Sequence, residues 1–200
     1  MKNIFSVIFI LSLATAAACA GTVKRGADAK PQTQFKGYYM DNNYFSCSIP
    51  SNWTLVREKE KDEEYNIYEI QLLAPKSEKV PTSVFVSYYA KDNEDFTDYR
   101  NFISRNSKNV LGETKSAREN YEPAKKIKLA GRNGFELANE VLEYLHPQTK
   151  SDESVQMKEK MYVLPAKDGF YVLKFSAAKD AFTENLPAFE KIAKSFKGKP

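Results

Sequence analysis

The stretch QMKEKMYVLPAKDGFYVLKFSA, residues 156–177, decides the fold class of this chain. Residues 156–164 and 170–177 are rich in aromatic and aliphatic side chains, which favour strands. Between them, residues 165–169 end in Asp168-Gly169, a pair typical of a tight turn between antiparallel strands. We therefore predict a β-hairpin here and an antiparallel sheet around it.

Strand patterns continue outward from this hairpin. Tyr68, Ile70 and Leu72 alternate onto one face, whereas residues 82–90 are apolar on both faces, which predicts a central strand. Strands are predicted at 37–40, 44–49, 54–57, 65–73, 82–90, 125–129 and 135–145, with turns at 41–43 and 131–134.

Two helices are predicted. In the first, residues 93–106, aromatic residues recur at helical spacing. The second runs from about Glu184 to Phe196 and should start near Asn185, because Pro187 is tolerated only in a first turn. Residues 58–64 are predicted as a charged loop, and 107–121 cannot be placed. The order of elements predicts an α+β fold, a mainly antiparallel sheet flanked by helices.

The first eighteen residues are typical of a secretory signal peptide. Lys2 precedes an uncharged run of fifteen residues, Ile4 to Ala18, which ends in small residues. That run is too short for a comfortable bilayer span, which needs about 20 residues.

Two peptidases fit the end of this signal. Ala18-Cys19-Ala20 satisfies a plain cut before Gly21, whereas Ala16 to Cys19 resembles a bacterial lipobox. We favour lipid attachment at Cys19, because a cysteine at the cut point is otherwise unexplained. The predicted organisation is a signal peptide at 1–18, a lipidated tether at 19–34 and one domain at 35–200. The protein would then be anchored to a membrane of the cell envelope, the outer one in a Gram-negative host, or be periplasmic if Cys19 carries no lipid.

Charge and cysteine content limit the classes of binding partner and the disulfide bonds that we expect. The net charge is +4, with Lys and Glu interleaved, so no nucleic-acid partner is expected. There are two cysteines, and Cys47 is predicted to be a small buried hydrophobe. A Cys19–Cys47 disulfide would need the plain signal-peptidase reading, and a cut before Gly21 would exclude it because that cut removes Cys19.

Groups that would carry catalysis are sparse. The single histidine, His146, is predicted to lie in a surface loop, with no second ligand nearby in the sequence. There is no G-x-S-x-G elbow and no phosphate-binding glycine loop. Trp53 is expected to close one end of the core. We therefore expect no enzyme activity, no cofactor and no metal.

Several segments resemble the PsbP-like superfamily. Residues 45–53 (FSCSIPSNW) resemble its opening strand with Pro and Trp, and residues 130–136 (AGRNGFE) resemble its middle glycine turn. Residues 168–177 with 189–196 resemble its closing hairpin and helix. The resemblance covers about residues 44–197 and is nearest in style to bacterial DcrB-like lipoproteins.

The resemblance implies an α/β/α sandwich around an antiparallel sheet and a role without catalysis, as an extrinsic subunit, assembly factor or binding module. The leading hypothesis is an envelope interaction module whose membrane contact is the lipid on Cys19 and whose protein partner is unknown. A small-ligand-binding domain with a tyrosine-lined cleft is the second hypothesis, and a hydrolase using His146 is the third. The oligomeric state stays open.

Overall fold

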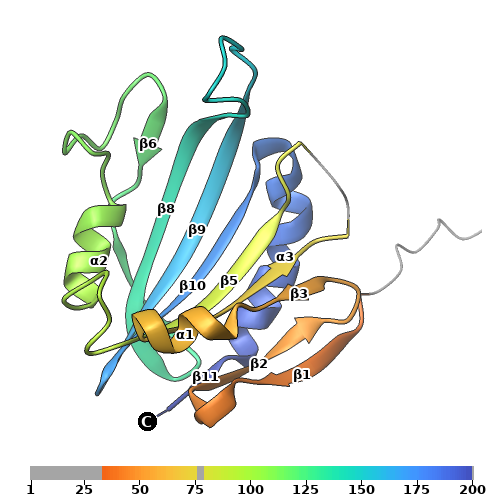
Figure 1. Cartoon of the computed structure of the whole chain (residues 1–200), viewed down its shortest axis with the longest axis vertical. Coiled ribbons are helices and arrows are strands. Elements are labelled where there is room, and N and C mark those ends of the chain that lie inside the picture. The colour runs from red at the N-terminus through yellow and green to blue at the C-terminus, as the bar shows by residue number, and fades with distance from the viewer. Residues whose placement is uncertain (1–32, 76–78, 200) are drawn as a thin grey trace, which may run out of the picture. The chain divides into compact units, whose positions relative to one another are not determined.

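The hairpin predicted at residues 156–177 lies in the middle of the main sheet (Figure 1). The computed structural model describes residues 33–75 and 79–199. In it, β9 (Ser154–Ala166) and β10 (Gly169–Ala178) pair antiparallel, with Gly169 opposite Ala166. The Asp168-Gly169 turn is therefore confirmed.

Two antiparallel sheets build the domain. The larger has the strand order β3-β4-β5-β10-β9-β8-β6, with β7 also paired to β8, and the smaller has the order β1-β2-β11. The central position of β5 between β4 and β10 confirms the prediction for residues 82–90. The other strands are β1 (Phe35–Tyr39), β2 (Phe45–Pro50), β3 (Thr54–Val56), β4 (Ile67–Leu73), β5 (Ser83–Ala90), β6 (Glu119–Tyr121), β7 (Lys125–Leu129), β8 (Arg132–Tyr144) and β11 (Lys197–Gly198).

Helices pack on both faces of the large sheet. Because strand residues alternate between faces, Phe175 of β10 packs toward α3 (Lys179–Ser195), whereas Phe170 packs with Phe102 of α2 (Tyr99–Asn106). Phe175 stacks on Phe189 of α3 with ring centroids 5.4 Å apart. The α3 face is thus the larger core. The predicted α+β class, an antiparallel sheet flanked by helices, is confirmed.

The start predicted for the last helix is wrong. The helix α3 begins at Lys179, and Pro187 lies inside it. An interior proline costs about 3 kcal/mol, because it removes a backbone hydrogen bond and crowds the preceding turn. The early turns bury Phe182 against Phe175, which contributes roughly 1.5–3 kcal/mol and offsets much of that cost.

The other helices also differ from the prediction. Most of residues 58–64, expected as a loop, and Tyr65, expected to begin a strand, form helix α1 (Lys59–Tyr65), because Lys and Glu are good helix formers even without an apolar stripe. Helix α2 begins at Tyr99 and not at Asn93. The Asn93 side chain accepts hydrogen bonds from the N–H groups of Asp95 and Phe96, closing a turn, and Asp98 caps the helix by accepting from the N–H of Asn101 at 2.8 Å. A short 3-10 turn, η1 (Asp41–Asn43), joins β1 to β2.

Candidate functional site

Polar side chains occupy the part of the α2-facing sheet surface that α2 leaves uncovered. On β4, Tyr68, Ile70 and Leu72 pack into the core on the α3 side, so the alternate residues Glu69 and Gln71 point to the other face. These positions lie beside Ser87 and Phe85 of β5, and the row continues to Lys174 of β10 and Glu159 of β9. The sheet thus brings together polar groups from four strands, which the chain order separates.

Two hollows follow this surface and share Gln71. The first has a volume of about 340 Å³ and lies between β4, helix α1 and the loop before α2. The second, about 410 Å³, includes Ser83, Lys174 and Glu159. We call the two together the open-face groove, and its first hollow the acidic pocket.

Carboxylates dominate the acidic pocket. Glu58, Asp62, Glu69 and Asp95 line it, with Arg57 as the one cation among its lining residues. A pocket with this balance favours a cationic group.

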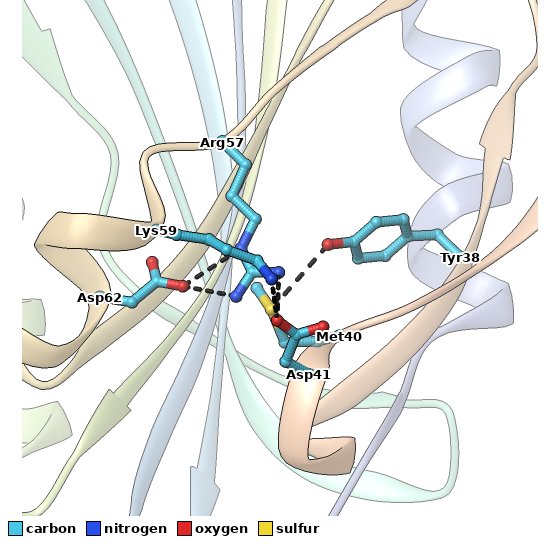
Figure 2. A network of polar contacts seen from close by, with 6 residues as sticks. All are labelled: Tyr38, Met40, Asp41, Arg57, Lys59 and Asp62. Atoms are coloured by element: carbon cyan, nitrogen blue, oxygen red, sulfur yellow. Dashed lines mark hydrogen bonds and ion pairs between the residues drawn. The ribbon is translucent and has the colours of Figure 1, made fainter.

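The cation of the pocket is already engaged (Figure 2). Arg57 lies between two aspartates, with its Nη1 3.1 Å from Asp41 Oδ2 and its Nη2 2.6 Å from Asp62 Oδ2. Its Nε also donates to Asp62 Oδ2 at 3.1 Å, and Lys59 Nζ lies 2.7 Å from Asp41. The side chains of Arg57 and Asp62 are only 14% and 6% exposed, so this pair fixes α1 against β3.

Glu69 is the most unusual of the carboxylates. It is partly buried on the sheet face, and the buried Ser87 hydroxyl donates to its Oε2 at 2.5 Å. Burial raises the pKa of Glu69, and the hydrogen bond from Ser87 only partly opposes that rise. The salt bridges formed by the described residues do not include Glu69. A buried carboxylate without a salt bridge costs stability, and such groups gather at binding sites.

A second polar cluster lies farther along the groove. Lys174 Nζ is 2.6 Å from Glu159 Oε1, and the Asn139 amide donates to Glu159 Oε2 at 3.2 Å. Asn139 is 5% exposed, and its Oδ1 has no hydrogen-bond partner among the described residues. An unsatisfied buried carbonyl carries a cost of about 1–3 kcal/mol.

The residues singled out in the sequence lie elsewhere. Cys19, the predicted lipid attachment site, is outside the described residues. His146 is exposed in the loop after β8, 3.5 Å from Glu153 Oε2. Cys47 and Trp53 are both buried in the core, which confirms the burial predicted for Cys47. Burial alone raises the pKa of the Cys47 thiol to about 12.

Four of the tyrosines pack against one another as a cluster. Tyr44, Tyr68, Tyr88 and Tyr171 pack ring against ring, with neighbouring centroids 4.0, 4.9 and 5.0 Å apart. Tyr88 and Tyr171 are buried, and the Tyr171 hydroxyl donates to the Tyr44 carbonyl at 3.0 Å. These contacts fill the space between the four rings.

Sequence reasoning missed the open-face groove. Alternation placed Glu69 and Gln71 on the face away from the core but did not show that this face would be partly enclosed. Arg57 and Asp62 were assigned to a strand end and a loop. The spacing Arg57-x-x-x-x-Asp62 was the one sequence signal for this ion pair, and it is weak because many unpaired residues share it.

The described residues form neither a metal-binding cluster nor a membrane-spanning helix. No group of three or more His, Cys, Asp or Glu side chains among residues 33–75 and 79–199 is arranged to hold a metal ion. Over the same residues, no helix has the length and apolar character that a membrane span requires.

Comparisons with known proteins rest on structure. No family model matches the sequence, and no curated protein matches it. Cyanobacterial PsbP (CyanoP) from Synechocystis sp. PCC 6803 is 15% identical, with a TM-score of 0.49 over 88% of this chain and 99% of that one. A protein from Bacteroides thetaiotaomicron is 12% identical, with a TM-score of 0.51 over 84% of this chain and 49% of that one.

A third neighbour is LpqN of Mycobacterium tuberculosis, a protein involved in cell envelope biogenesis. It is 13% identical, with a TM-score of 0.46 over 84% of this chain and 92% of that one. At such identities the comparisons show the fold alone. That fold is a large antiparallel sheet flanked by a few helices.

Proposed function

We propose that this chain is an exported, membrane-tethered interaction module of the bacterial cell envelope, and that it binds its partner in the open-face groove. The tether rests on the basic start, the apolar run and Cys19, all in the first nineteen residues. The binding role rests on the groove. Acylation of Cys19 would hold the domain at a membrane surface.

One observation carries the assignment of the groove. Glu69 keeps a partly buried carboxylate on a sheet face that α2 leaves uncovered, where an apolar residue would be more stable. Residues that cost stability in this way are typical of functional surfaces. Because carboxylates outnumber cations around the acidic pocket, the partner should present a basic side chain or an amine there.

The role we propose is not catalytic. His146, the best candidate for an acid or base, lies in an exposed loop, and the described residue that faces it is Glu153, not a nucleophile. The hydroxyl of Ser87 is committed to Glu69.

A charge-matched pair of variants tests the groove. Gln71 belongs to both hollows, so Gln71→Arg places a large side chain and one added positive charge in the groove. Thr183→Arg adds the same charge on the exposed side of α3. After cross-linking and purification of the full chain from envelope membranes, wild type and Thr183→Arg should recover the same partner, and Gln71→Arg should lose it. Equal recovery by all three proteins would remove the groove from the proposal.

The anchor has a separate test. Intact mass of the mature protein extracted from membranes should show an N-terminal Cys19 carrying acyl chains. A mature chain that begins at Gly21 would exclude lipid attachment and leave the groove proposal untouched.

A small cationic ligand is the second candidate. The acidic pocket, at about 340 Å³, is within the range of small-molecule sites. A thermal-shift screen with small amines should then stabilise wild type but not Gln71→Arg.

A further inference from the structure

The turn Asn109–Gly112 presents two apolar side chains to solvent. Val110 is fully exposed and Leu111 is 79% exposed, and they are adjacent in the chain. The turn lies between α2 and β6, in a segment that projects beyond the sheet in Figure 1. Single exposed apolar residues are common on proteins, but two adjacent ones at a projecting tip need an explanation.

The turn holds its own shape. The Asn109 side-chain oxygen accepts hydrogen bonds from the N–H groups of Leu111 at 3.0 Å and Glu113 at 2.9 Å. The N–H of Gly112 donates to the Asn109 carbonyl at 2.9 Å, and Gly112 adopts a left-handed φ of +83°. The tip is therefore ordered without any packing by Val110 or Leu111. Central turn positions usually carry Gly, Pro, Asn, Asp or Ser, so turn formation does not explain why Val110 and Leu111 occupy them.

Basic side chains flank the apolar tip. Arg105 and Lys108 line the same hollow, of about 620 Å³, as Val110 and Leu111. Arg105 is held in place, since its Nη1 donates to the Asp95 carbonyl at 2.8 Å. From residue 105 to residue 118 the chain carries four basic residues and one acidic residue.

One acidic group also lines that hollow. Glu119 accepts a hydrogen bond from the Tyr121 hydroxyl at 3.3 Å, and both residues line the hollow. The balance of charge at the tip remains positive.

We propose that the Asn109–Gly112 turn inserts into an anionic lipid surface. Val110 and Leu111 enter the boundary between headgroups and acyl chains, while Arg105 and Lys108 contact lipid phosphates. Aliphatic residues projecting beside basic ones are the chemistry that binds such an interface. The charge complementarity favours an anionic membrane over a neutral one. This contact is independent of both the groove and the lipid on Cys19.

Vesicle binding tests the proposal on a chain that starts at Thr33. Residues 33–199 contain every described strand and helix and all three core clusters, so this segment carries its own core. Co-sedimentation is measured with vesicles of phosphatidylcholine and phosphatidylglycerol, and with vesicles of phosphatidylcholine alone. The variants are V110S/L111S, K108Q and, as a control, Y39S, which removes another strongly exposed side chain.

The wild-type segment and Y39S should bind the anionic vesicles, and binding should fall as salt rises. V110S/L111S should bind at least about 30-fold more weakly, and K108Q about fivefold more weakly. In a Leu111→Trp variant, anionic vesicles should shift the tryptophan emission to the blue. The proposal is overturned if wild type does not bind, if V110S/L111S binds as well as wild type, or if the tip instead drives self-association in sedimentation velocity.

Discussion

Gly169, at the turn of the central hairpin, gives the sharpest stability prediction. Its φ is +144°, a region that L-residues rarely adopt, and a Cβ added there would lie 2.0 Å from the Tyr89 carbonyl oxygen on β5. Gly131 also has a positive φ, +80°, but a Cβ added there would meet nothing within 4 Å. Both glycines thus have a positive φ, and only Gly169 also has a close steric contact.

Alanine substitution at each glycine compares the cost of the positive φ with the cost of the added steric clash. Gly131→Ala should cost about 1–2 kcal/mol of unfolding free energy, from the left-handed backbone alone. Gly169→Ala adds to its backbone strain a clash that forces β10 away from β5, which costs a further 1–3 kcal/mol or so. We therefore expect Gly169→Ala to be roughly 2 kcal/mol less stable than Gly131→Ala.

Urea unfolding, followed by circular dichroism and by the fluorescence of the buried Trp53, measures both free energies. The slope of free energy against urea concentration should be unchanged in both variants, so that the midpoint reports stability. Equal destabilisation by the two substitutions would refute the close approach of β5 to the hairpin turn.

Three further predictions concern titratable groups. Burial raises the pKa of Glu69 in the folded state, so the protein should lose stability as pH rises from the ordinary glutamate pKa through the raised pKa. Glu69→Gln should remove this loss and be more stable than wild type at neutral pH. If the unfolding free energy of Glu69→Gln depends on pH as that of wild type does, the prediction is contradicted. Asp62→Ala leaves the partly buried Arg57 with Asp41, half exposed, as its remaining carboxylate partner among the described residues, and should cost about 3 kcal/mol in urea unfolding. A cost below about 1 kcal/mol would show that the pair is solvated. The Cys47 thiol, buried and with its pKa raised to about 12, should resist iodoacetamide at neutral pH until the protein is unfolded, and rapid labelling of the native protein would show that this part of the core opens.

Local signals predicted most of the sheet. The Asp168-Gly169 turn, the two-sided apolar pattern of β5 and the turn at Asp41–Asn43 each depend on neighbouring residues, and each is where the sequence placed it. The helices depended more on tertiary contacts. The packing of Phe182 on Phe175 extends α3 past Pro187, and no local pattern reports that contact.

The candidate site was harder to predict, because its residues meet only after folding. Glu69 and Lys174 come from strands about a hundred residues apart, and β5 lies between them. The acidic pocket also needs helix α1, which the sequence analysis assigned to a loop. Val110 and Leu111 fell in the segment that could not be placed, since a turn with apolar central residues matches no turn pattern. Cys19, read from a local motif, stays a prediction outside the described residues.

Site-specific photo-cross-linking in the living cell tests the central claim most directly. A photoreactive residue replaces Gln71 in the open-face groove in one full-length protein, and Thr183 on the exposed side of α3 in another. We expect one discrete cross-linked species from position 71, absent from position 183 and reduced when the wild-type chain without the photoreactive residue is co-expressed in excess. Cross-links from position 183 alone, or from neither position, would contradict an interaction module that binds through the groove.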